Sequence, residues 1–222
     1  MELKPIAHFH SPFTSKFGIP KQSGLVAQLR GEIVLERDYR DKDALRGIEE
    51  FDYLWLIWGF SANRHAATSP TVRPPLLGGN ERVGVFATRS PFRPNAIGLS
   101  SVRLDHVEWD TPRGPVIHVL GADLMQGTPI YDIKPYVVYA DCHPEARSGF
   151  VDKHPIHRLQ VVIAQEVAAQ LSATQLEALR GALALDPRPH YQHDASKVYG
   201  MPFAGLDVHF KVDGDTLTVL PD

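Results

Sequence analysis

Short apolar runs separated by glycine- and proline-rich turns predict that the first 140 residues form mostly strands. Residues 53–60 are apolar on both faces of such a strand, so we expect this strand to be central and buried. One short capped helix is expected over residues 41–46. Because crossover helices are scarce, the pattern favours an antiparallel barrel or sandwich over a doubly wound sheet. The predicted strands are residues 6–10, 32–35, 53–60, 83–88, 97–109 and 116–120, with one or two more at 130–133 and 136–140.

The pattern changes after residue 140. Residues 141–158 lack periodicity, which is typical of a linker or long loop. A strand over residues 159–164 precedes a helix over residues 172–185, for which Ser172 is the expected N-cap. Two further runs, 205–210 and 216–220, predict a hairpin. We therefore expect two domains, a mainly β N-terminal domain over residues 1–150 and a small α+β C-terminal domain over residues 151–222.

The charge is unevenly distributed along the chain. The 222 residues carry a net charge of −3. The stretch 64–103, however, holds six arginines, no lysine and only one acid, Glu81. Arginine suits bidentate recognition of phosphate or carboxylate, which favours an anion-binding face over a chance cluster. The sequence pI of about 6.4 argues against a chain that coats nucleic acid non-specifically.

Two proline-bounded segments hold candidate binding groups on stiff backbone. The loop around Pro91 and Pro94 presents arginine, aromatic and amide side chains, and its rigidity lowers the entropy lost on binding. Residues 186–191 form a second stiff ribbon with an arginine and two rings. This ribbon suits RNA, whose unstacked bases pack on aromatic or guanidinium planes, and equally suits a turn that ends a helix.

A third segment concentrates groups for proton transfer. If residues 130–133 are extended, Asp132 shares a face with Ile130 and Lys134, which places a proton acceptor beside a cation. A surface ion pair without a chemical role explains the same spacing equally well.

Several site classes lack support. No glycine-rich dinucleotide fingerprint, phosphate-binding loop or nucleophile elbow is present. Three histidine pairs (8 and 10, 154 and 157, 190 and 193) lack a third ligand nearby, so no metal is expected. The single cysteine, Cys142, indicates a reducing compartment, and no signal pattern or membrane-length apolar run occurs. We therefore expect a cytoplasmic protein.

Ten stretches of the chain, in order, resemble the TrmO family of tRNA methyltransferases. The most specific of them is the one that begins at Gly84, which holds two arginines and two prolines. As they stand here, they are Ser11-Pro-Phe, Pro20-Lys-Gln, Gly24-Leu, Leu54-Trp-Leu, Thr71-Val-Arg-Pro-Pro, Gly78-Gly-Asn, Gly84-Val-Phe-Ala-Thr-Arg-Ser-Pro-Phe-Arg-Pro-Asn, Gly127-Thr-Pro, Asp132-Ile-Lys-Pro-Tyr and Asp186-Pro-Arg-Pro-His-Tyr.

The resemblance implies S-adenosylmethionine-dependent methylation of N6 of threonylcarbamoyladenosine, at position 37 of threonine tRNA. It also implies a single-sheeted antiparallel β-barrel, a small C-terminal domain and a homodimer; no membrane or DNA partner is expected. The cofactor-binding residues carried over from the family are Pro20, Lys21, Gln22, Ser61, Ala62, Arg89, Leu99, Asp123, Leu124, Met125 and Gln126. Enterobacterial members are similar but have His-Gln in place of Ser61-Ala62 and aspartate in place of Gln126.

On this interpretation, Asp132 accepts the N6 proton, with Lys134 and Tyr136 as orienting groups, and Arg93 or Lys134 pairs with the threonyl carboxylate. The expected tRNA-binding residues are Arg73, Phe92, Arg93, Asn95, Arg188 and Tyr191. Two alternatives remain open at this point: a tRNA- or nucleotide-binding module without catalysis, and a barrel that binds an anionic metabolite.

Overall fold

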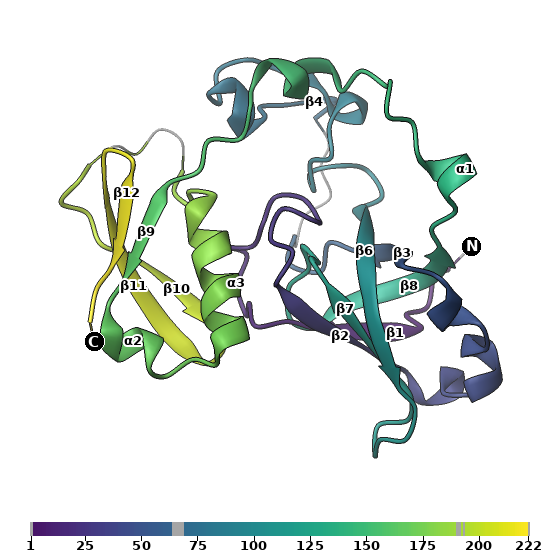
Figure 1. The fold of residues 1–222 in the computed structure, drawn as a ribbon. Coiled ribbons are helices and arrows are strands. Elements are labelled where there is room, and N and C mark those ends of the chain that lie inside the picture. Colours follow the sequence, from purple (N-terminus) through teal and green to yellow (C-terminus); the bar gives the residue numbers. More distant parts are fainter. Residues whose placement is uncertain (1, 64–68, 190–191, 193, 222) are drawn as a thin grey trace.

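The computed structural model describes residues 2–63, 69–189, 192 and 194–221. Six antiparallel strands form one closed barrel in the order β1-β2-β7-β6-β3-β8 (Figure 1). The predicted single-sheeted barrel is therefore confirmed. Its strands are β1 (Ala7–His10), β2 (Arg30–Leu35), β3 (Tyr53–Gly59), β6 (Ile97–Glu108), β7 (Val116–Leu120) and β8 (Thr128–Pro135).

Strand β3 shows how alternation divides the barrel wall. Leu54 and Leu56 point inward and are fully buried, whereas Tyr53, on the outer face, is 45% exposed. The prediction that this strand is buried on both faces is therefore wrong, because a barrel strand presents one face to the outside. The apolar outer residues instead form an aromatic cluster, in which Trp55 lies 5.8 Å from Tyr136 between ring centroids.

Two predicted strands take other conformations. Within 83–88, only β5 (Val83–Gly84) is extended; it pairs with β4 (Thr71–Val72) outside the barrel, and a 3-10 turn follows. Residues 136–140 lead into α1 (Val138–Asp141), because the Asp141 carboxylate accepts a hydrogen bond from the Val137 N–H. The short helix expected over 41–46 is present as a 3-10 helix. The 3-10 helices are Arg37–Tyr39, Lys42–Leu45, Ile48–Glu50, Pro75–Leu77, Val85–Ala87 and Gly149–Lys153.

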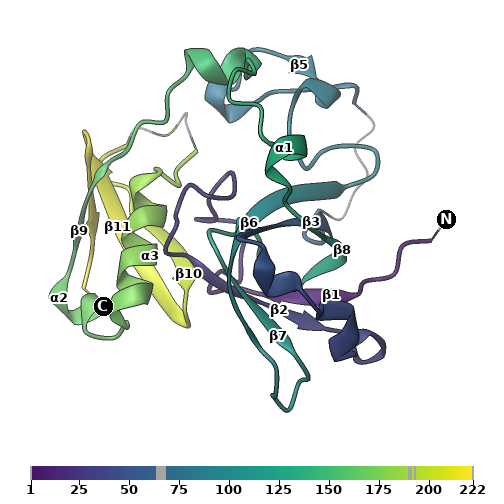
Figure 2. The same ribbon diagram turned by 45° about the vertical axis from the view of Figure 1, so that its right-hand side comes forward.

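A second sheet, in the order β10-β11-β12-β9, forms the C-terminal unit and packs against α3 (Figure 2). The predicted helix and hairpin are confirmed, and Ser172 caps α3 by accepting a hydrogen bond from the Gln175 N–H. Strand β10 escapes the sequence pattern because Gly200 and Pro202 interrupt its apolar run. The elements are β9 (Gln160–Ile163), α2 (Gln165–Ala168), α3 (Ala173–Ala184), β10 (Tyr199–Phe203), β11 (Leu206–Asp213) and β12 (Thr216–Val219).

The loop between β1 and β2, residues 11–29, leaves the barrel and packs into the core of the C-terminal unit. Phe13 meets Phe203 edge to face, with ring centroids 5.2 Å apart, and Phe17 stacks on Phe210. In Figure 1 this purple loop reaches α3. The loop is therefore held by the C-terminal unit while both of its ends belong to the barrel.

Candidate functional site

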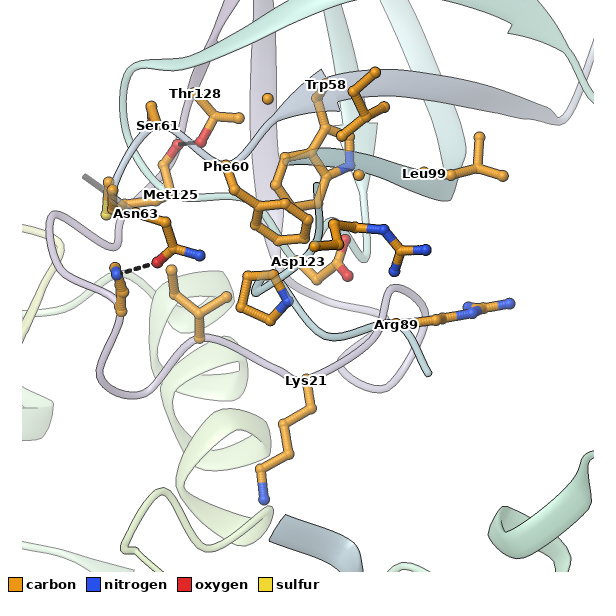
Figure 3. A pocket seen from close by; sticks show the side chains of 18 of the residues that line it. Lys21, Trp58, Phe60, Ser61, Asn63, Arg89, Leu99, Asp123, Met125 and Thr128 are labelled. Atoms are coloured by element: carbon orange, nitrogen blue, oxygen red, sulfur yellow. Dashed lines mark hydrogen bonds between the residues drawn. The ribbon is translucent and has the colours of Figure 1, made fainter. Parts of the chain in front are cut away.

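A cavity of about 740 Å³ lies where four segments meet (Figure 3). They are the β1–β2 loop, the end of β3, the loop around Pro91 and Pro94, called the arginine–proline loop below, and the segment after β7. This volume is in the range of small-molecule sites. Residues from four distant parts of the sequence line it, among them Lys21, Ser61, Arg89 and Asp123.

Two aromatic side chains in contact with each other form part of the apolar cavity wall. Trp58 and Phe60 meet edge to face, with ring centroids 4.4 Å apart. The Trp58 indole lies across Gly98 on the neighbouring strand, so a Cβ atom placed at Gly98 comes within 2.3 Å of the ring. The absence of a side chain at residue 98 therefore sets the position of Trp58.

We expect Gly98→Ala to destabilise the protein by about 1–3 kcal/mol, because the added methyl group forces the indole off its position. Urea unfolding monitored by tryptophan fluorescence measures this change. Gly84→Ala is the matched control, because nothing lies within 4 Å of its added Cβ. Equal stability of the two variants would contradict this packing argument.

A short hydrogen-bonded chain links the aromatic wall to a carboxylate. Trp58 Nε1 donates to Ser100 Oγ at 3.0 Å, and Ser100 Oγ donates to Asp123 Oδ1 at 2.6 Å. Burial raises the pKa of Asp123, while the hydrogen bond from Ser100 and the charge of Arg89 oppose this rise. Among the described residues that line the cavity, Asp123 is the only acid.

Within the described part of the chain, four cations line the same cavity: Lys16, Lys21, Arg89 and Arg93. Arg89 Nη1 donates to Gln22 Oε1 at 2.7 Å, which ties the arginine–proline loop to the β1–β2 loop. Arg93 Nη1 donates to the Thr88 carbonyl at 3.1 Å and stiffens its own loop. The cavity therefore combines one carboxylate with an excess of positive charge.

Most of the predicted cofactor-binding residues lie together. The cavity is lined by Pro20, Lys21, Gln22, Ser61, Ala62, Arg89, Leu99, Asp123 and Met125. Leu124 and Gln126 do not line it. Leu124 is buried in the barrel core, and Gln126 Oε1 accepts a hydrogen bond from the Ser11 N–H at 2.8 Å.

Sequence reasoning missed Trp58, Phe60 and Asn63 as lining residues. The two aromatics belong to an apolar run that we interpreted as core, and only their place at the end of a strand could have identified them. Asn63 Oδ1 accepts a hydrogen bond from Lys16, whereas Asn63 Nδ2 is buried with no partner among the described residues.

The expected tRNA-binding residues are divided. Arg93 and Asn95 line the cavity, whereas Arg73 and Phe92 are exposed and do not line it. Arg188 is engaged within the chain, since its Nε donates to Asp186 Oδ1 at 2.9 Å and only 10% of its side chain is exposed. Tyr191 lies outside the described residues, as do Arg64 and the histidines at 190 and 193.

Asp132 and Lys134 lie outside the cavity, on the outer face of the barrel. Their side chains form an ion pair with 2.9 Å between Lys134 Nζ and Asp132 Oδ2, as the spacing predicted. The prediction that Asp132 shares a face with Ile130 is wrong, because the register shifts between them and Ile130 points into the core. Such a bulge sends the residues on its two sides to opposite faces.

The ion pair nevertheless lies near the cavity. Ile57 on β3 pairs with Leu99 on one side and with Asp132 on the other. Strand spacing therefore puts the Cα atoms of Leu99 and Asp132 about 10 Å apart on one outer face. Leu99 also lines the cavity and is 56% exposed. The cavity thus opens beside the face that carries the ion pair.

Tyr136 adjoins this face at the end of β8. Its ring lies 6.0 Å from that of Tyr53, between centroids. Desolvation and the neighbouring Cys142 raise the pKa of Tyr136, so its phenol remains a hydrogen-bond donor at neutral pH. Within the described residues, no group of three histidine, cysteine or acidic side chains is arranged to hold a metal ion.

Comparison with known proteins assigns this geometry to a family. Residues 8–142 match the family model described as the tRNA-methyltransferase O N-terminal domain, and residues 156–221 match the TrmO C-terminal domain. The chain belongs to the TrmO family. The barrel thus falls within the match to the N-terminal family model, and the C-terminal unit falls within the match to the C-terminal one.

Individual TrmO relatives agree. The tRNA (adenine(37)-N6)-methyltransferase of Escherichia coli strain K12 is 39% identical over 95% of this chain and 93% of its own. A Pseudomonas aeruginosa relative named an S-adenosylmethionine-dependent methyltransferase is 38% identical over 94% of this chain and 91% of its own. The crystal structure of TrmO from P. aeruginosa matches with a TM-score of 0.79 at 34% identity, covering 99% of this chain and 95% of that one.

Proposed function

We propose that this chain transfers the methyl group of S-adenosylmethionine to N6 of the threonylcarbamoyladenosine at position 37 of threonine tRNA. The observation that carries the proposal is the cavity, whose described lining has a single carboxylate and which opens at Leu99 toward the Asp132–Lys134 pair. The E. coli relative is named for the same atom of adenine 37. The threonylcarbamoyl group and the tRNA species come from the family resemblance.

The residues of the cavity fit this cofactor. S-adenosylmethionine has a sulfonium and an ammonium, which are cations, and a carboxylate, an aromatic base and a ribose. Asp123 offers a negative charge for the cationic part, and Arg89 offers a guanidinium for the carboxylate. The buried, unpaired Nδ2 of Asn63 is a donor that a bound ligand can satisfy. When bound, the cofactor supplies an activated methyl group.

The outer face beside the cavity suits the acceptor nucleoside. Bringing N6 close to the methyl group supplies much of the rate enhancement of such a displacement. Methylation replaces the proton on N6, and the Asp132 carboxylate accepts that proton, held in place by Lys134 Nζ. Tyr136, as a phenol, donates a hydrogen bond in the same region.

The surface around the cavity suits an anticodon loop. Phe92 is 56% exposed and offers a ring on which an unstacked base can pack. Arg73, Arg93 and Asn95 supply charge and hydrogen bonds for phosphates or for the threonyl carboxylate.

No helix in the described part of the chain is long and apolar enough to cross a membrane. We propose that the reaction takes place in the cytoplasm.

We propose that the chain is a homodimer that uses α1 and the neighbouring outer end of β3. This region exposes large apolar side chains, namely Tyr53, Val138 and Tyr139. Exposed apolar patches of this kind mark interaction sites. Light scattering at micromolar concentration is expected to give twice the mass of 24.7 kDa.

The test of the function is methyl transfer from labelled S-adenosylmethionine to threonine tRNA, with and without its threonylcarbamoyl group. We expect label only in the modified tRNA. Label in both would remove the threonylcarbamoyl group from recognition. No label in either, together with no binding of the cofactor, would favour a binding protein for tRNA or for an anionic metabolite.

A further inference from the structure

Residues 19–22, called the wall segment below, form one continuous part of the cavity wall. The segment lies between two attachments. On the barrel side, the Gly24 N–H donates a hydrogen bond to the Gly121 carbonyl oxygen at 2.8 Å, directly after β7. On the other side, Phe17 stacks on Phe210 of β11, with ring centroids 6.3 Å apart. The wall segment is therefore attached to the barrel and to the C-terminal unit.

Gly18, which directly precedes the wall segment, packs against Met201 of β10. A Cβ atom placed at Gly18 comes within 2.3 Å of Met201 Sδ, so the absence of a side chain at residue 18 allows this contact. Gly18 also has φ +90°, in the left-handed region that glycine adopts without strain. Met201 is fully buried in the core of the C-terminal unit. This core therefore reaches the residue next to the cavity wall.

Ile19 belongs both to the cavity wall and to the packing of the C-terminal unit. Its side chain lines the cavity and is partly buried against the core that contains Met201. Three positions further along, Gln22 accepts a hydrogen bond from Arg89 at 2.7 Å. Because protein cores are close-packed, a change in the volume of Met201 is felt by its neighbours. A shift of Gly18 therefore moves an apolar part of the wall and a partner of Arg89 together.

We propose that Met201 is a positioning residue that packs against Gly18 and thereby holds the wall segment in the conformation that binds S-adenosylmethionine. Among the described residues, none after Thr128 lines the cavity. The C-terminal unit thus acts on the cofactor through the wall segment. The proposal rests on the proposed function for the identity of the ligand.

The test compares two substitutions of Met201 at a temperature where both variants are folded. Met201→Ala removes the atoms that contact Gly18. We therefore expect the Kd for S-adenosylmethionine, measured by titration calorimetry, to rise by about five- to tenfold. Hydrogen exchange of the Gly24 amide in the cofactor-free protein is expected to speed up by about tenfold. Met201→Leu, of similar volume, is expected to keep both quantities within about twofold of the wild type.

Leu217→Ala is the control for a loss of core packing without a loss of positioning. Leu217 is fully buried in the same core, on β12, which β11 separates from β10. Its truncation is expected to destabilise the protein about as much as Met201→Ala does. The Kd for the cofactor and the exchange of the Gly24 amide are nevertheless expected to stay within about twofold. Equal changes in the two alanine variants would overturn the proposal, because they would reflect only the stability of the C-terminal unit.

Gly18→Ala disturbs the same contact from the side of the loop and keeps the proposal testable if Met201→Ala does not fold. The added methyl group meets Met201 Sδ, so we expect the Kd for the cofactor to rise by at least about fivefold. Gly205→Ala is the matched control, because Gly205 has φ +85° but nothing within 4 Å of an added Cβ. It carries the backbone strain without the contact, and its Kd is expected to stay within about twofold.

The double variant tests whether Gly18 and Met201 act on each other. In Gly18→Ala combined with Met201→Ala, the smaller side chain leaves room for the added methyl group. The two losses of cofactor affinity are therefore expected to be less than additive. Additive losses would contradict a direct contact between the two residues.

Unchanged cofactor affinity in both Met201→Ala and Gly18→Ala would overturn the proposal. Weaker binding of threonine tRNA with unchanged cofactor affinity would also overturn it and assign this part of the C-terminal unit to RNA. If the wild-type protein transfers no methyl group and binds no S-adenosylmethionine, the proposed function fails. Exchange of the Gly24 amide then still decides whether Met201 positions the wall segment.

Discussion

Replacing Asp123 by asparagine is expected to raise the Kd for S-adenosylmethionine by about 30-fold, the loss of one charge-assisted interaction of about 2 kcal/mol. The shape of the cavity is retained, because asparagine Oδ1 can still accept the hydrogen bond from Ser100. What the variant loses is the only negative charge among the described lining residues. Titration calorimetry with S-adenosylmethionine measures the effect.

The same substitution is expected to leave the protein as stable as the wild type at pH 7, or more stable. Burial raises the pKa of Asp123 in the folded state above its ordinary value near 3.8. The contribution of this carboxyl group to stability is thus fully present below pH 3.8 and is lost as the pH rises through the folded-state pKa. Asp123→Asn does not titrate, so it gains stability relative to the wild type as the pH rises from about 3.8 through the folded-state pKa of Asp123.

Cofactor affinity is expected to have the opposite pH dependence. The cationic part of S-adenosylmethionine favours the ionised form of Asp123, so wild-type affinity falls as the pH is lowered through that pKa. The asparagine variant is expected to show no such fall. Asn63→Ser, which shortens a side chain that lines the cavity without changing its charge, is the control for the pH dependence of cofactor affinity. A wild-type profile parallel to that of Asp123→Asn would refute the assignment.

The barrel could be predicted because its signal is local. Strand β6 (Ile97–Glu108) carries its own alternation of buried and exposed residues over most of its length, and glycine and proline mark the turns. Closure into a barrel depends on the pairing of β1 with β8, residues far apart in the sequence. Periodicity alone therefore left a sandwich open, and only the family resemblance indicated a barrel.

The details of the site depend on contacts that no local pattern encodes. The register shift next to Tyr131 separates Ile130 from Asp132, and nothing in the alternation marks it. Phe13 lies in a loop without periodicity, yet it is fully buried against Phe203, which lies 190 positions away in the sequence. The motifs identified many of the residues around the cavity. How these residues are arranged in space could be seen only in the structure.

From the sequence, the Asp132–Lys134 pair could equally be a surface ion pair without a chemical role. Its substitution has the largest expected effect on turnover. Asp132→Asn is expected to lower kcat by about 100-fold or more, the range for removal of a general base. Cofactor affinity is expected to stay within twofold, because Asp132 lies outside the cavity. Single-turnover methyl transfer to modified threonine tRNA measures the effect.

The matched control for this variant is Asp105→Asn, another acid paired with a cation on the barrel surface, at 3.5 Å from Arg30. If the pair on β8 served only the fold, both variants would keep full turnover and show the same small loss of stability, below about 1 kcal/mol for an exposed ion pair. Undiminished turnover in Asp132→Asn would exclude Asp132 as the proton acceptor. If Asp132→Asn alone loses turnover while its cofactor affinity is unchanged, the acceptor adenine lies on the outer face between Leu99 and Asp132. The reason is that removal of a group in reach of N6 lowers the rate of methyl transfer without changing the Kd for the cofactor.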